Sequence, residues 1–137
     1  MKFKLIVLTL TLSLSSHFFA QSQESIEERG IHKVVIYETD FEEGEKDKRI
    51  IEERVYDAQA NLIEYKEYDD YGKAEVWEKY AYNEQGKMIS ETFLNAKGEQ
   101  EKRIEHIYVD GLKREKRYYD HKNRLSKTKY YEYSYHQ

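Results

Sequence analysis

Residues 56–94, YDAQANLIEYKEYDDYGKAEVWEKYAYNEQGKMISETFL, decide the fold, because turn signals and strand signals alternate in them at short intervals. Three clusters open with Tyr-Asp or Tyr-Asn and close near an asparagine or a glycine: 56–61, 68–72 and 82–86. Asp or Asn at the start of a turn accepts a hydrogen bond from a backbone N–H two residues on, and Gly or Asn near its end tolerates a positive φ. Each cluster therefore predicts a tight turn between two strands.

The same signal recurs along the rest of the chain. The closing residues are spaced 11, 14, 12, 13 and 12 apart, and they are Asn61, Gly72, Gly86, Gly98, Gly111 and Asn123. Such intervals are typical of short strands joined by tight turns. The segments between the turns are rich in Tyr, Val, Ile, Thr and Trp, which suit a pleated, half-buried surface. We predict eight strands, at about 33–39, 49–57, 62–68, 74–82, 87–94, 102–109, 112–119 and 124–135.

Successive tight turns make neighbouring strands antiparallel, so the predicted fold is an all-β antiparallel meander. The segment 112–119, LKREKRYY, alternates charged and aromatic residues on both faces, which a dry sandwich core would not accommodate. Tyrosine rings and the stems of Lys and Arg can cover a sheet while their polar ends stay in water. We therefore favour an open, single, curved sheet over a closed up-and-down barrel. Pairing between segments 33–39 and 124–135 would indicate the barrel.

Composition excludes several classes of protein. The 137-residue chain has no cysteine and no proline, 36% of its residues are charged, and its mean hydropathy is −1.01. Disulfides, a cysteine zinc site, a thiol nucleophile and a lipid-modified cysteine are all excluded. The length fits one domain with a modest core.

The first 20 residues resemble a secretory signal peptide. Lys2 and Lys4 precede the ten-residue apolar run 5–14, which is too short to span a bilayer, and small residues follow. Cleavage after Ala20 or after Ser15 fits the pattern. We expect a signal peptide over 1–20, a flexible lead over 21–32 and a β-repeat domain over 33–137. The expected location is secreted or periplasmic, in a bacterial envelope.

Net charge argues against some partners. The formal charge is −4, and removal of the signal segment leaves 21 basic against 27 acidic residues. We therefore expect no nucleic-acid partner, because such partners require a net positive surface. The chain has no second long apolar run, so we expect no membrane span after signal removal.

The recurring Tyr-Asp, Gly or Asn, basic and apolar pattern resembles the YD repeats of RHS-type proteins. The resemblance covers about residues 35–135. The same pattern is also similar to the MORN-like repeats of some bacterial antitoxin-type proteins. Ala60 stands where the YD repeat has glycine, and Asn95 and Val109 replace the Tyr-Asp pair. The residues that carry it are Tyr56-Asp57 with Asn61-Leu62, Tyr68-Asp69 with Gly72-Lys73, Tyr82-Asn83 with Gly86-Lys87-Met88, and Tyr119-Asp120 with Asn123-Arg124-Leu125. The resemblance implies a small, non-catalytic sheet of β-hairpin repeats.

No pattern predicts catalytic, cofactor-binding or metal-ligating residues. The four histidines after the signal segment, His32, His106, His121 and His136, lack ligand spacing, and nucleophile and phosphate-loop motifs are absent. The acidic segment 40–47 lacks the frame of a calcium loop, so we interpret it as a solvated hairpin loop. We therefore expect that the protein is not an enzyme. A hydrolase acting on glycans is a weaker hypothesis than the two binding functions described below.

The aromatic residues are the candidate binding face. Strand alternation would place Tyr131, Tyr133 and Tyr135 on one face, and aromatic strips can bind a partner segment or stack on sugars. The competing interpretation is that tyrosine covers the sheet as leucine does elsewhere. The candidate residues are Trp77, Tyr65, Tyr80, Tyr82, Tyr131, Tyr133 and Tyr135.

The predicted function is that of a secreted or periplasmic protein-interaction or scaffold module, because a repeat sheet with open edges can add a partner strand. A first alternative is a β-barrel that binds a small ligand or a glycan. A second is an immunity or antitoxin-type protein. An unknown protein partner is expected first and a glycan second, and the oligomeric state stays open.

Overall fold

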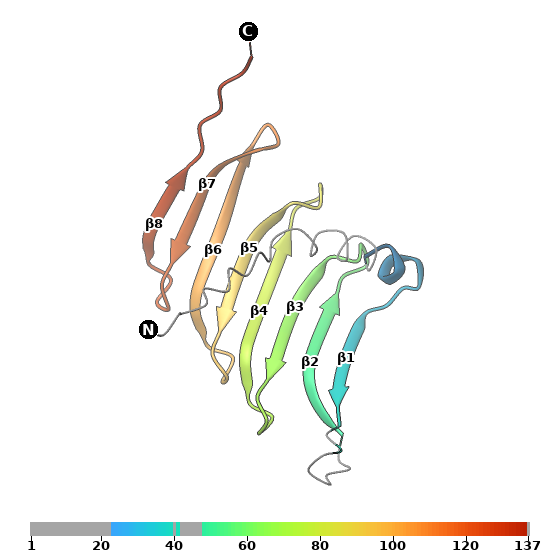
Figure 1. The fold of residues 1–137 in the computed structure, drawn as a ribbon. Helices are drawn as coiled ribbons and strands as arrows, with labels where there is room; N and C mark the ends of the chain where they lie inside the picture. Colours follow the sequence, from blue (N-terminus) through green and yellow to red (C-terminus); the bar gives the residue numbers. More distant parts are fainter. Residues whose placement is uncertain (1–22, 40, 42–47, 137) are drawn as a thin grey trace, which may run out of the picture.

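The computed structural model describes residues 23–39, 41 and 48–136, and the predicted signal segment lies outside this part of the chain. Eight antiparallel strands form one sheet in the order β1 to β8 (Figure 1). The strands are β1 (Lys33–Glu38), β2 (Arg49–Tyr56), β3 (Leu62–Tyr68), β4 (Ala74–Tyr82), β5 (Met88–Leu94), β6 (Gln100–Val109), β7 (Leu112–Tyr119) and β8 (Leu125–Tyr130).

The predicted all-β antiparallel meander is confirmed, and so is the open sheet. Each strand pairs only with its neighbours in sequence, and β1 and β8 lie at opposite ends of the sheet (Figure 1). The closed barrel that we kept as an alternative is wrong, because no ladder joins β1 to β8 among the described strands. An enclosed barrel cavity is therefore not available for a ligand.

Five of the turns share one geometry, and this geometry explains why the same residue pattern recurs in the sequence. An Asp or Asn side chain accepts from the backbone N–H groups two and four residues on, and its own backbone closes the loop with two further bonds. The fourth residue of each turn has a positive φ. The turns open at Asp57, Asp69, Asn83, Asn95 and Asp120.

The β6–β7 connection differs from these five turns. Asp110 and Gly111 both have positive φ, at 50° and 76°. This is the geometry of a two-residue turn that follows the right-handed twist of the two strands.

The residue with positive φ in the first of the five turns is Ala60, at 59°, and not Asn61 as the spacing suggested. Ala60 is only 3% exposed, and Ile26 of the short helix 23–28 is 8% exposed. The two residues line one hollow of about 350 Å³. The left-handed backbone costs an alanine about 1–2 kcal/mol, and the burial of its methyl group offsets part of this cost.

The helix 23–28 occupies part of the segment that we expected to be a flexible lead. It is short and acidic, with Glu24, Glu27 and Glu28, and it has one apolar residue, Ile26, turned toward the sheet. A single apolar residue gives no helical periodicity over ten positions. The sequence therefore carried no signal for this helix.

Every ladder contains one irregularity, on the strand that follows the turn. In the β4–β5 pair, for example, Tyr82 pairs with Met88 and Ala81 with Ser90, which leaves Ile89 as an extra residue. Such bulges increase the twist of a strand and bend the sheet. Their repetition along the sheet accounts for its curvature in Figure 1.

The two faces of the sheet follow from the register. Tyr80, Glu91, Ile104, Tyr118 and Lys127 are paired in turn across five strands, and we call their side the Tyr80 face. We call the other side the Trp77 face. Most side chains on both faces are half-buried, and within the described residues the buried ones are Ile26, Ala60, Ile104 and His106. The described part of the chain is therefore a single layer of sheet whose two faces are both partly exposed.

Candidate functional site

The predicted aromatic residues do not form one face. Tyr65, Tyr80 and Tyr82 lie on the Tyr80 face, since Tyr65 pairs with Glu78 and Tyr80 with Glu91. Trp77 pairs with Lys66 and lies on the opposite side. Alternation within β4 explains the split, because odd and even positions of a strand point to opposite faces.

Two tyrosines of the Tyr80 face, Tyr65 and Tyr80, are held by carboxylates on their own strands. The Tyr65 hydroxyl donates to Glu67, and the Tyr80 hydroxyl donates to Glu78. Burial, and then these hydrogen bonds, raise the pKa of both phenols. The two hydroxyls therefore stay protonated at neutral pH, where they act as donors.

Trp77 is enclosed by its neighbours on the Trp77 face. Its Nε1 donates to Glu64 at 2.7 Å, and the Lys66 ammonium lies 4.0 Å from the centre of the ring system. Gly98, in the β5–β6 turn, approaches the far edge of the indole so closely that a Cβ built there would lie 3.1 Å from it. Two side chains of β3 and the β5–β6 turn thus hold the ring, and Trp77 serves as cover for the sheet.

Three tyrosines form a repeating latch between neighbouring strands. The hydroxyls of Tyr82, Tyr108 and Tyr133 donate to the carbonyl oxygens of Leu62 (2.9 Å), Met88 (3.1 Å) and Lys113 (2.7 Å). Successive members are 26 and 25 residues apart, which is about twice the interval between turns. The structural repeat is therefore a pair of strands and not a single strand.

Tyr131, Tyr133 and Tyr135 lie beyond the last strand, which ends at Tyr130 and not near residue 135 as expected. The β7–β8 ladder ends where Glu115 pairs with Tyr130, next to the extra residue Arg114 of the β6–β7 ladder. One more backbone bond follows, from Tyr131 N to Arg114 O at 2.9 Å. The predicted strip of three tyrosines on one strand is wrong, and Tyr133 is the third latch residue.

His106 is the most buried polar side chain described, at 6% exposure. Its Nε2 lies 2.6 Å from Glu91 Oε1, while its Nδ1 is buried without a hydrogen-bond partner. Lys116 Nζ lies 3.8 Å from the same Glu91 oxygen. Burial lowers the pKa of His106 against the opposing effect of Glu91, so the imidazole is neutral at pH 7.

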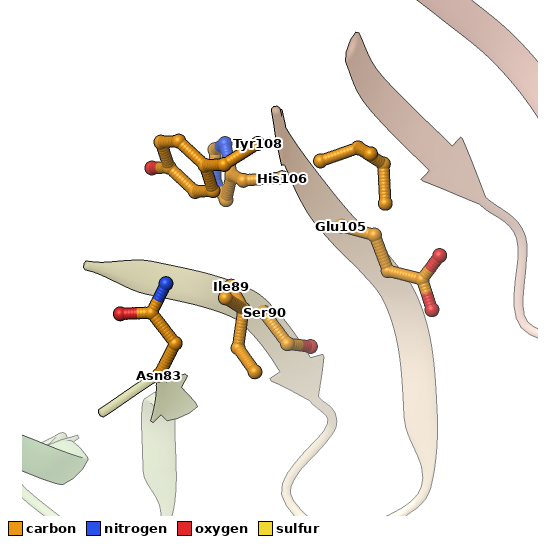
Figure 2. A pocket seen from close by; sticks show the side chains of 7 residues that line it. Asn83, Ile89, Ser90, Glu105, His106 and Tyr108 are labelled. Carbon is orange, nitrogen blue, oxygen red and sulfur yellow. The ribbon is translucent and has the colours of Figure 1, made fainter. Parts of the chain in front are cut away.

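A shallow hollow of about 450 Å³ lies beside His106. Figure 2 shows His106 and Tyr108 on one side of β6 and Glu105 on the other, with Asn83 and Ile89 across from them. The hollow contains one histidine, and its one carboxylate, Glu105, is already bonded to Arg103 and Tyr119. These groups do not form a nucleophilic or metal-binding site. Within residues 23–39, 41 and 48–136 no three metal-binding side chains come together.

The described histidines His32 and His121 form no hydrogen bond or ion pair with His106 or Glu91. His32 Nδ1 donates to the carbonyl oxygen of Tyr56 at 3.1 Å, and this bond helps to fix the start of β1. His121 is exposed in the β7–β8 turn. The acidic segment that we interpreted as a solvated loop, residues 40–47, lies almost entirely outside the described residues.

The edges of the sheet differ in chemistry. β1 carries Val34, Val35, Ile36 and Tyr37 in succession, whereas β8 alternates Lys127 and Lys129 with other residues. Lysine on an edge strand opposes pairing with another chain. The middle of the β8 edge is therefore protected by charge, whereas the middle of the β1 edge, between Lys33 and Glu38, carries none.

The comparisons with known proteins give no relative from which a function could be carried over. The chain matches no known family model and no curated protein. Among the described helical residues, no segment has both the length and the apolar character needed to cross a bilayer.

Proposed function

We propose that this chain is a secreted or periplasmic, non-catalytic protein-interaction module, which binds an extended segment of a partner protein along β1. The open β1 edge is the observation that carries the proposal. The backbone of β1 pairs with β2 on one side only, and no described strand lies on its other side. An exposed edge offers a row of backbone donors and acceptors, to which a partner strand can add.

The side chains of β1 suit such a partner. Val34 and Ile36 point to the Tyr80 face, and Val35 points to the Trp77 face, where it pairs with Glu53. A partner strand with apolar residues at every position facing β1 would form cross-strand pairs on both sides of the sheet. The contrast with the lysines of β8 gives the module one receptive edge and one protected edge.

The proposal is tested with matched lysine substitutions at the two edges. Val35 and Thr128 are both half-buried, lie at the middle of an edge strand, and point to the Trp77 face. Val35→Lys should prevent recovery of the partner that the wild-type chain, without residues 1–20, captures from envelope extract. Thr128→Lys should leave recovery unchanged, and circular dichroism should show that both variants are folded. Equal recovery by Val35→Lys and wild type would refute a role of the β1 edge.

A further inference from the structure

The charged side chains on the Tyr80 face change character along the sheet. Over β2 to β5 this face carries carboxylates together with Arg54. At the regular ladder positions of β6, β7 and β8 it carries no carboxylate. The charged residues there are Lys102, Lys113, Lys116, Lys127 and Lys129.

The opposite face of the same strands is neutralised internally. Arg103 forms an ion pair with Glu105, and Arg117 forms one with Glu115 at 2.7 Å. Among the five lysines of β6–β8 on the Tyr80 face, only Lys116 has a carboxylate within ion-pair distance, and that carboxylate, Glu91, is shared with His106. The positive charge of β6–β8 is therefore concentrated on one side of a chain whose total charge is −4.

Three of these lysines gather around one ring. The ammonium groups of Lys116, Lys127 and Lys129 lie 5.6, 4.8 and 5.9 Å from the centre of the Tyr118 ring. The attraction of one aromatic quadrupole for an ammonium at an exposed site is weak. A bound anion would compensate the charge of the three ammonium groups that surround this ring.

We propose that Lys116, Lys127 and Lys129 around Tyr118 form a binding site for a phosphate group of a ligand. Lysine binds phosphate as a compact point charge, whereas the planar fork of arginine matches both carboxylates and phosphates. The arginines of β6 and β7 that have carboxylate partners lie on the other face, and the site itself is built from lysines. A long nucleic acid is disfavoured, because the acidic strands β3 to β5 continue the same sheet.

The site is tested by titration of inorganic phosphate into the chain without residues 1–20, against chloride at equal ionic strength. Saturable shifts of the lysine side-chain NMR signals are expected. The double variant Lys127→Gln with Lys129→Gln should weaken binding at least about tenfold, because it removes two charged donors to the phosphate. Tyr118→Phe, which keeps the ring, should bind as the wild type does.

The matched control is Lys73→Gln with Lys97→Gln, which removes the same charge from two exposed turn residues. This pair should change the affinity by less than about twofold, because salt screens distant surface charges. Equal weakening in both double variants would overturn the proposal, since net charge alone would then explain the effect. Absence of saturation by phosphate in the wild type would overturn it as well.

Further arms identify the source of the phosphate. Saturable binding of a sugar phosphate supports a phosphorylated saccharide, and retention on phosphatidic acid vesicles but not on phosphatidylcholine vesicles supports a lipid headgroup. A glutamate polymer that binds as tightly, with the same lysine dependence, would replace the phosphate site by a site for an acidic protein. Val35→Lys should bind phosphate normally, so that a failure of the edge proposal and a failure of this one are distinguishable.

Discussion

Gly86 and Gly98 hold the same position in two equivalent turns, but only Gly98 has an aromatic ring against it. Their φ values are 72° and 80°, so alanine is strained at both positions. A Cβ at Gly86 meets nothing within 4 Å, whereas a Cβ at Gly98 meets Trp77 at 3.1 Å. A comparison of alanine substitutions at these two positions therefore separates the cost of backbone strain from the cost of packing against Trp77.

We predict that Gly86→Ala lowers the free energy of unfolding by about 1–2 kcal/mol through the left-handed backbone alone. Gly98→Ala should cost about 1 kcal/mol more, because the indole must also shift. Urea unfolding of both variants checks the difference. A cost for Gly98→Ala no larger than that for Gly86→Ala would contradict the enclosed position of Trp77.

Asp120 opens the β7–β8 turn, and its carboxylate accepts from Lys122 N, Arg124 N and the Arg124 guanidinium. The backbone and side chain of Arg124 lower the pKa of Asp120 from 3.8 to about 2. The unfolded chain therefore binds a proton at a higher pH than the folded chain does. The contribution of Asp120 to stability is complete above about pH 4 and is lost as the pH falls toward 2.

We predict that Asp120→Asn weakens the dependence of unfolding free energy on pH between about 4 and 2. Asparagine should preserve the turn, because Asn83 and Asn95 open equivalent turns with the same backbone bonds. Unfolding curves of wild type and variant across this range check the difference. An unchanged pH dependence would contradict the role of the ionised carboxylate.

At the scale of elements, the latch tyrosines join β4, β6 and the segment after β8 to the start of the strand before each of them. Tyr108→Phe removes the donor to Met88 O, and it should lower the free energy of unfolding by about 1 kcal/mol. Tyr71, which is 95% exposed, is the control, and Tyr71→Phe should leave stability unchanged. Thermal unfolding compares the two variants. Equal stability of Tyr108→Phe and wild type would show that the latch contributes nothing.

The strands were predictable from the sequence because local chemistry repeats at each turn. Asp or Asn followed three residues later by Gly, Ala or Asn fixes the loop, and β-branched and aromatic residues fill the strands between. Seven of the eight predicted strands lie within two residues of the observed bounds at each end. The last strand was predicted too long, since nothing in the alternating tyrosines signals the end of its ladder at Glu115.

The arrangement of side chains was less predictable than the strands. Tyr65, Tyr80 and Trp77 looked like one cluster because they are near in sequence, yet the register places Trp77 on the other face. The gathering of Lys116, Lys127 and Lys129 around Tyr118 depends on the β7–β8 register, which a composition argument does not contain. The latch was missed because its period spans two strands.

At the scale of the whole molecule, one layer of sheet replaces the usual packed core. The described chain has four buried residues, and two of them, Ile26 and Ala60, belong to the contact between helix and turn. Stability therefore comes from backbone ladders, half-buried aromatic rings and ion pairs spread along the sheet. In the described part of the chain, this architecture leaves two broad faces and the β1 edge accessible, as the proposed binding role requires.

The most direct test of this account is residue-resolved hydrogen exchange of the free chain and of its complex with the captured partner. In the free chain, the outward amides of β1 should exchange faster than those of the central strands β4 and β5, because no strand covers them. Binding of the partner should slow exchange in β1 and leave β8 unchanged. Protection that falls on β8 instead, or β1 amides already as slow as the central ones without a partner, would contradict an open sheet that binds through β1.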